Sequence, residues 1–145
     1  MRILIADSAP RVRSALKLYI EQYRSDVEIL EAGSLNEVQY LAERCRIEVA
    51  LIDWHLPKQG GEAALLYLRR TQPDACVVVL SGRPEAERQA SDADAFISKG
   101  DPLDSLKAIL EQRGSYSGRR PARSDGIGGP SGNQAAPQHA RRAHL

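Results

Sequence analysis

Four polar residues of this sequence stand where short aliphatic runs end, and together they could perform chemistry. The set holds two carboxylates, a hydroxyl and an ammonium: Asp7, Asp53, Ser81 and Lys99. Two carboxylates can hold a divalent cation such as Mg²⁺. A carboxylate can also attack phosphorus when such a cation screens the repulsion between anions. Because the hydroxyl and the ammonium could then bind the phosphoryl oxygens, the set is sufficient to form and hold an aspartyl phosphate.

The segments around these residues predict a fold that brings them together. Five aliphatic runs predict strands at residues 3–6, 27–30, 49–52, 76–80 and 95–97. Amphipathic segments alternate with these runs, which is typical of an α/β fold with helices on both faces of a parallel sheet. In such a doubly wound sheet, ligands bind beyond the carboxyl ends of the strands. We therefore expect the four polar residues at one edge of the sheet.

The predicted helices have start signals of unequal strength. A capping box predicts that the second helix starts at Ser34, because its hydroxyl and the Glu37 carboxylate can each bind a free amide. An acid followed by proline, Asp101 and Pro102, predicts the start of the fifth helix. The fourth segment, residues 84–90, covers barely two turns and has only alanines as apolar residues. We expect a short fourth helix.

Four motifs at the ends of predicted strands resemble those of response regulator receiver domains of two-component systems. They are Ile3-Leu4-Ile5-Ala6-Asp7, Leu51-Ile52-Asp53-Trp54-His55-Leu56-Pro57 with Gly60-Gly61, Val79-Leu80-Ser81-Gly82, and Phe96-Ile97-Ser98-Lys99. Each motif is weak alone, but four in the right order form a specific signal. The resemblance covers essentially all of residues 1–113. It implies the flavodoxin-like receiver fold, a five-stranded, doubly wound parallel sheet in the order 2-1-3-4-5.

The resemblance also implies a phosphoacceptor and a metal site. Asp53 corresponds to the aspartate that accepts the phosphoryl group and contributes to the Mg²⁺ site, and Asp7 corresponds to a further metal-site carboxylate. His55 corresponds to the residue whose backbone carbonyl binds the metal. The imidazole of His55 is therefore not implied as a ligand, and we expect it to shape the rim of the site.

Three further residues match the switch residues of the family. Ser81 resembles the hydroxyl that turns toward the phosphoryl group, and Lys99 resembles the lysine that pairs with it. Phe96 matches the aromatic residue that moves between outward and inward rotamers on activation. A simple core role suits Phe96 equally well, because it is the only phenylalanine of the chain.

The sequence departs from the family pattern at the site itself. Receiver domains have two adjacent acids after the first strand, whereas Ser8 follows Asp7 here. The missing acid is the one that touches the ion directly, so we expect Mg²⁺ to bind weakly. The segment between Ser81 and Lys99 is several residues short for the family, and Gly100 replaces a frequent proline. These departures favour an alternative, a pseudo-receiver that works as an interaction module without phosphorylation.

Composition divides the chain near residue 113. Residues 1–113 carry 15 Lys and Arg against 18 Asp and Glu, a net charge of −3, whereas residues 114–145 carry five Arg and one Asp, a net charge of +4. The second segment is rich in Gly, Pro, Ser and Arg and holds almost no large aliphatic residue, so burial cannot offset its chain entropy. We interpret residues 1–113 as a receiver domain and residues 114–145 as a disordered basic tail.

These features predict a signalling protein rather than an enzyme. We expect a stand-alone response regulator that receives its phosphoryl group from a sensor histidine kinase or a phosphotransfer protein. Its output would be contact with a downstream protein effector through the face made by the fourth helix, fifth strand and fifth helix. Direct DNA binding is not expected, because no helix-turn-helix pattern follows residue 113. Whether phosphorylation promotes a homodimer is left open.

The sequence predicts a cytoplasmic protein without a membrane segment, because its first apolar run is short and ends at Asp7. A flavodoxin-like cofactor binder on the same frame is a third alternative. Residues 7–11 speak against it, because they lack the glycines that let a phosphate approach backbone amides.

Overall fold

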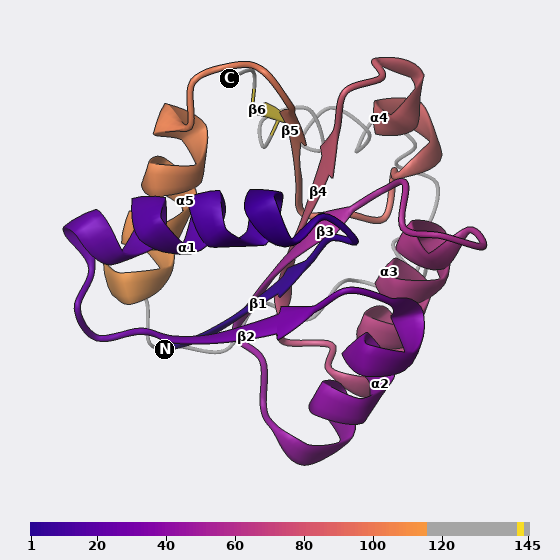
Figure 1. The fold of residues 1–145 in the computed structure, drawn as a ribbon, viewed down its shortest axis with the longest axis horizontal. Coiled ribbons are helices and arrows are strands. Elements are labelled where there is room, and N and C mark those ends of the chain that lie inside the picture. Colours follow the sequence, from indigo (N-terminus) through magenta and orange to yellow (C-terminus); the bar gives the residue numbers. More distant parts are fainter. Residues whose placement is uncertain (116–141, 144–145) are drawn as a thin grey trace, which may run out of the picture.

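A computed structural model describes residues 1–115 and 142–143 of the chain (Figure 1). Strands and helices alternate, as the hydrophobic pattern predicts. In chain order they are β1 (Arg2–Ala6), α1 (Pro10–Tyr23), β2 (Glu28–Ala32), α2 (Leu35–Arg44), β3 (Val49–Asp53), α3 (Gly60–Thr71), β4 (Cys76–Ser81), α4 (Glu85–Gln89), β5 (Ala95–Ser98), α5 (Asp104–Ser115) and β6 (Arg142–Ala143).

All strand pairs of the sheet are parallel, and the order is β2-β1-β3-β4-β5-β6. The first five strands confirm the predicted order 2-1-3-4-5. Because β1 lies between β2 and β3, the strand order reverses there, and the loops after β1 and β3 leave the sheet side by side. This arrangement places Asp7 next to Asp53 at the carboxyl edge.

The sixth strand departs from the expected five-stranded sheet. Arg142 pairs with Phe96 and Ala143 with Ile97, so two residues from the segment interpreted as disordered extend the sheet. The physical reason is that an outer strand such as β5 presents unpaired backbone groups on its open side. α5 also continues to Ser115, two residues past the predicted boundary. The rest of that segment, residues 116–141 and 144–145, lies outside the described residues.

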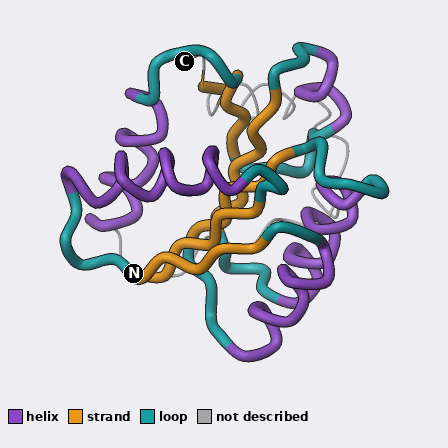
Figure 2. The backbone as a smooth tube through the Cα atoms, viewed as in Figure 1, coloured by secondary structure: helices purple, strands orange, loops and turns teal. Residues whose placement is uncertain are grey.

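Helices cover both faces of the sheet (Figure 2). Successive residues of β1 alternate between the two faces, as in any strand. Ile3 and Ile5 belong to the hydrophobic cluster under α1 and α5. Leu4 and Ala6 belong to the cluster under α2, α3 and α4. All five residues of β3 are buried, as expected for a central strand covered on both sides.

The predicted helix starts differ in outcome. Ser34 is the N-cap of α2 and its hydroxyl accepts a hydrogen bond from the Glu37 amide, which confirms that start, although the Glu37 carboxylate accepts from Gly33 rather than from Ser34. The predicted start of α5 at residues 101–102 is wrong, because the helix begins at Asp104. A turn occupies the preceding residues, with Gly100 at a φ of +97° and the Asp101 amide bonded to the Ser98 carbonyl.

The fourth helix is short, as predicted. α4 has five residues, and it packs inward through the buried Ala86 and through Ala90, the buried residue that follows the helix. A side-chain bond supplements this packing, because the indole N–H of Trp54 donates to Gln89 Oε1 over 3.0 Å. α4 is thereby tied directly to the loop that follows Asp53.

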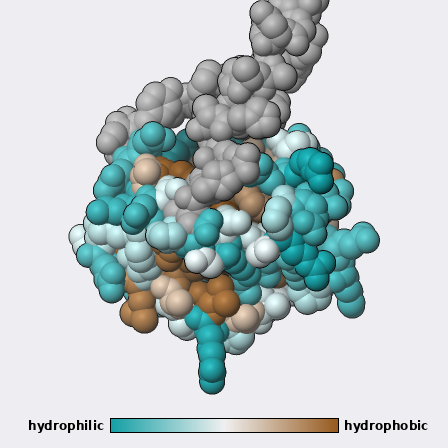
Figure 3. Space-filling model, turned by 90° about the horizontal axis from the view of Figure 1, so that it is seen from above, coloured by the Kyte–Doolittle hydropathy of each residue, from teal (hydrophilic) through white to brown (hydrophobic). Residues whose placement is uncertain are grey.

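The surface seen from above in Figure 3 is mostly hydrophilic, with hydrophobic residues in smaller patches between. In the described part of the chain, the large hydrophobic side chains that remain exposed are Leu18, Tyr40 and Leu66, on α1, α2 and α3. No helix of this part is both long and apolar enough to span a membrane.

Candidate functional site

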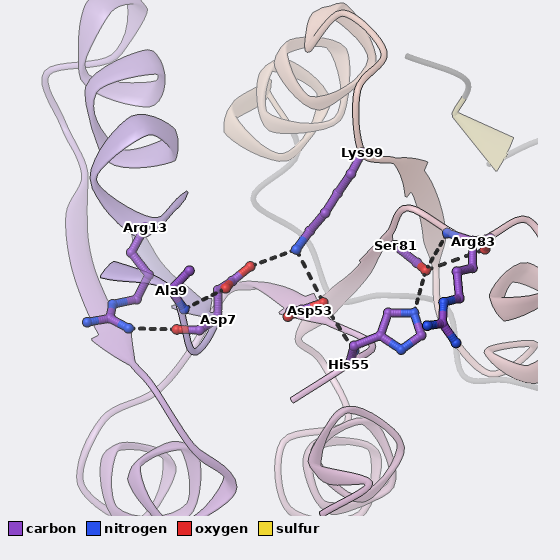
Figure 4. Close-up of polar contacts among 8 residues, drawn as sticks. All are labelled: Asp7, Ala9, Arg13, Asp53, His55, Ser81, Arg83 and Lys99. Atoms are coloured by element: carbon purple, nitrogen blue, oxygen red, sulfur yellow. Dashed lines mark hydrogen bonds and ion pairs between the residues drawn. The ribbon is translucent and has the colours of Figure 1, made fainter. Parts of the chain in front are cut away.

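The four predicted polar residues gather at the carboxyl edge of the sheet (Figure 4). Asp7 follows β1, Asp53 ends β3, Ser81 ends β4 and Lys99 follows β5. These four strands are consecutive neighbours in the sheet, so their ends form a continuous row. The row divides into two groups of contacts, one around Lys99 and one around Ser81.

The Lys99 ammonium bridges the two carboxylates. Its Nζ lies 2.9 Å from Asp7 Oδ2 and 3.3 Å from Asp53 Oδ1. Both aspartates are nearly buried, with 2% of Asp7 and 6% of Asp53 exposed. Burial lowers the pKa of Lys99, but the hydrogen bond to Asp7 and the charges of Asp53 and Asp7 outweigh burial, so the pKa is raised above its ordinary value. Lys99 therefore remains a cation at neutral pH and balances charge in the site.

The two oxygens of Asp53 have different surroundings. Oδ1 accepts a hydrogen bond from the His55 amide over 3.1 Å and also faces Lys99. Oδ2 has no hydrogen-bond partner within the described part of the chain. The only fully buried side-chain atom of this part without a partner is the Tyr23 hydroxyl, so Oδ2 is not fully buried. This oxygen is therefore the one available to a metal ion or to an electrophile.

Asp7 is fixed by contacts that the sequence pattern did not reveal. Its Oδ1 accepts a hydrogen bond from the Ala9 amide over 2.9 Å, and its backbone carbonyl accepts one from Arg13 Nη1 over 2.6 Å. Arg13 also pairs with Glu31 on β2. No sequence signal marks Arg13, because a basic residue on the first turns of a helix is ordinary on a surface.

The second group joins Ser81 to the imidazole of His55. His55 Nε2 lies 2.9 Å from Ser81 Oγ, and the same hydroxyl oxygen accepts a hydrogen bond from the Arg83 amide over 3.0 Å. Ser81 is fully buried, whereas His55 is exposed at the rim. The His55 side chain thus does more than shape the rim: it holds the hydroxyl expected to bind a phosphoryl group.

The carboxylates fit a divalent cation, but with few ligands. Asp7 and Asp53 lie close enough for one ammonium, that of Lys99, to contact both, and Mg²⁺ is commonly held by one or two carboxylates with water. Ser8 is exposed and adds no carboxylate, and no cluster of three or more His, Cys, Asp or Glu suited to a metal occurs among the described residues. Mg²⁺ would also compete with Lys99 for Asp7 Oδ2. The residues therefore fit a weakly held ion.

Phe96 lies inside the protein rather than at the row of polar side chains. It is 7% exposed and belongs to the hydrophobic cluster that also holds Trp54, Ala86 and Ala90. This position agrees with a core role. It also places the Phe96 ring in the same hydrophobic cluster as Ala86 of α4, so a change of the Phe96 rotamer would alter the packing of α4.

Comparison with known proteins agrees with this geometry. Residues 3–111 match the family model of the response regulator receiver domain. The transcriptional regulatory protein SrrA of Staphylococcus aureus is 31% identical over 111 residues, which cover 74% of this chain and 44% of SrrA. The glycerol metabolism activator of Pseudomonas putida is 28% identical over 116 residues, covering 77% of this chain and 52% of the activator. The chain thus spans about half the length of the curated relatives it matches.

A solved structure shares both the fold and part of the sequence. A response regulator protein from Burkholderia pseudomallei, solved with a phosphorylated aspartic acid, a calcium ion and citrate, is 25% identical with a TM-score of 0.67, and the match covers 79% of this chain and 68% of that one. A second likeness, at 22% identity and a TM-score of 0.69, is the response regulator protein TrrA from Thermotoga maritima in complex with Mg²⁺ and BeF, matched over 77% of this chain and 97% of TrrA. That second likeness concerns the fold alone.

Proposed function

The chain belongs to the family of response regulator receiver domains, and on this premise we propose that Asp53 accepts a phosphoryl group from the phosphohistidine of a sensor histidine kinase or a phosphotransfer protein. The family is one of signalling domains rather than classical enzymes. The observation that carries the proposal is the position of Asp53, which ends the central strand with one oxygen bound and the other open.

In the proposed transfer, Asp53 Oδ2 attacks phosphorus while the P–N bond of the donor phosphohistidine breaks. The proton that the leaving imidazole requires comes from the donor protein or from water. Lys99 keeps its positive charge throughout and binds oxygens of the transferred group. The His55 amide holds Asp53 Oδ1, which keeps the carboxylate oriented with Oδ2 outward.

Asp7, Asp53 and the backbone carbonyl of His55 are the groups that would hold Mg²⁺. When bound, the ion supplies positive charge that screens the repulsion between Asp53 and the phosphoryl oxygens. Because Asp7 Oδ2 is bonded to Lys99, the lysine must move before that oxygen is free. This competition, together with Ser8, supports weak metal binding.

After transfer, the added charge of about −1.5 to −2 attracts hydrogen-bond donors. Ser81 leaves His55 and donates its hydroxyl to the phosphoryl group. Since Ser81 Oγ also accepts from the Arg83 amide, its movement displaces the start of the loop that leads to α4. We propose that a partner protein then reads the face formed by α4, β5 and α5.

A pseudo-receiver is the second candidate, favoured by Ser8 and by the lysine that already balances Asp7 and Asp53. Incubation with acetyl phosphate over a series of Mg²⁺ concentrations, followed by intact mass measurement, separates the two candidates. A receiver gains one phosphoryl group, and Asp53→Asn gains none. The absence of an adduct at every Mg²⁺ concentration would support the pseudo-receiver instead.

A further inference from the structure

The edge of β5 that faces away from β4 pairs with β6, a segment more than forty residues further along the chain. β5 would be the outermost strand of the sheet, but β6 lies beside it, with Arg142 opposite Phe96 and Ala143 opposite Ile97 (Figure 1). From this pairing we infer that the β5 edge is an acceptor for an extended basic segment, and that residues 142–143 occupy it in the same molecule. The inference deepens the proposed function, because β5 lies in the face proposed to contact partners.

Backbone groups rather than apolar side chains must supply the affinity of this edge. In the described part of the chain, the exposed large hydrophobic side chains lie on α1, α2 and α3, whereas α4, β5 and α5 carry none. An edge strand nevertheless offers a row of unpaired N–H and C=O groups to any extended segment. The surface therefore fits strand addition better than a hydrophobic groove contact.

Charge favours a basic occupant of the edge. The stretch from α4 to the start of α5, residues 83–104, holds six acidic and three basic residues. One of these basic residues, Lys99, is bound to Asp7 and Asp53, and one of the acidic residues, the buried Asp94, is bound to Arg69. The segment that pairs with β5 lies within Arg141-Arg142-Ala143-His144. The four residues of β5 are uncharged, so it is the acidic residues flanking β5 that would raise the local concentration of a basic segment at this edge.

Occupation of the edge has a consequence for signalling. The pairing places Arg142 opposite Phe96, which matches the family's aromatic switch position, and it covers the edge of β5 within the proposed output face. A partner that uses β5 must therefore displace residues 142–143 or bind beside them. The segment acts as a reversible mask over the face.

Amide hydrogen exchange, followed by NMR on the full chain, tests this inference. The double substitution Arg142→Pro and Ala143→Pro removes both backbone donors of β6. The matched control, Ala122→Pro with Arg123→Pro, changes the same two residue types elsewhere in the chain. The β5 amides that point away from β4 should exchange about tenfold faster in the first variant, since losing one backbone hydrogen bond shifts the opening equilibrium by about that factor. The control should match the wild type.

A synthetic peptide of residues 138–145, added to the first variant, should restore the slow exchange. Equal exchange in the wild type, the first variant and the control would overturn the inference. Protection that disappears on dilution, together with a dimer-to-monomer change, would also overturn it, because a second copy would then supply the strand.

Each protein is also treated with acetyl phosphate and Mg²⁺. Slow exchange of the β5 amides without a gain of a phosphoryl group would contradict the proposed function but not the pairing of β6 with β5. A gain of a phosphoryl group with fast exchange of the β5 amides would contradict the pairing but not the proposed function.

Discussion

His55 Nε2 lies 2.9 Å from Ser81 Oγ, so the second residue after the proposed phosphoacceptor holds the hydroxyl proposed to bind the phosphoryl group. The contacts of this hydroxyl oxygen are with His55 and with the backbone of Arg83 (Figure 4). The phosphoryl group must therefore compete with an imidazole for the same side chain.

His55→Ala removes this competition. A typical hydrogen bond contributes about 0.5–1.5 kcal/mol, so we expect the variant to bind beryllofluoride, a phosphoryl mimic, about 2-fold to 10-fold more tightly in the presence of Mg²⁺. Titration monitored by Trp54 fluorescence measures the affinity. The control is the same substitution in a Ser81→Ala background, where it should have little effect. An equal gain in both backgrounds would show that His55 acts in some way other than through Ser81.

Lys99→Met should destabilise the protein in a manner that depends on pH. Breaking a buried ion pair costs about 3–5 kcal/mol, and we expect about 1–3 kcal/mol here, because a third of the Lys99 side chain is exposed. The pKa of Lys99 is raised in the folded state, so its stabilisation is complete below the unfolded pKa and is lost as the pH rises through the folded pKa. Urea unfolding at pH 7 and at increasing alkaline pH measures the difference from the wild type.

That difference should shrink at the alkaline end. Lys17→Met on α1 serves as the control, with a smaller effect on the free energy of unfolding at pH 7. A pH-independent loss in Lys99→Met would mean that the ion pairs are not its cause.

Ser8→Asp should strengthen metal binding. A further carboxylate next to Asp7 attracts a divalent ion strongly even at the effective dielectric of a protein surface, and we expect at least about tenfold tighter Mg²⁺ binding after desolvation is subtracted. Trp54 is the only tryptophan and directly follows Asp53, so its fluorescence during Mg²⁺ titration reports occupancy. Ser14→Asp, exposed on α1, is the matched control. If both substitutions tighten binding equally, net charge rather than ligation is responsible.

Gly61→Ala should disturb both the fold and the site. A Cβ at position 61 would collide with the backbone of Trp54, next to Asp53, whereas a Cβ at Gly82 would meet no atom within 4 Å. Overpacking of this kind costs about 1–3 kcal/mol. Urea unfolding should show this loss for Gly61→Ala and almost none for Gly82→Ala. Similar stabilities of the two variants would contradict the close approach of α3 to the loop after β3.

Local sequence signals were sufficient to predict most of the fold. Aliphatic runs mark buried strands, because a strand covered on both faces favours apolar residues at successive positions, as the first four residues of β3 show. The capping motif at Ser34 marks the start of α2 for an equally local reason. The start of α5 could not be predicted so well, because the turn through Gly100 takes up the residues that otherwise resemble a helix start.

Contacts across the site could not be predicted from sequence, because they depend on which strands are neighbours and on side-chain rotamers. The bond from His55 to Ser81 and the bond from Trp54 to Gln89 both join residues more than twenty positions apart. The pairing of residues 142–143 with β5 was also missed, because their composition opposes strand formation and only the open edge of β5 favours it.

Identification of the phosphorylated residue tests the central claim most directly. The full chain is incubated with acetyl phosphate and Mg²⁺, reduced with borohydride, which converts an aspartyl phosphate to homoserine, and digested for peptide mass analysis. We predict homoserine at position 53 and at no other aspartate. Homoserine at another position, or none at all under conditions that label an established receiver domain, would contradict the account.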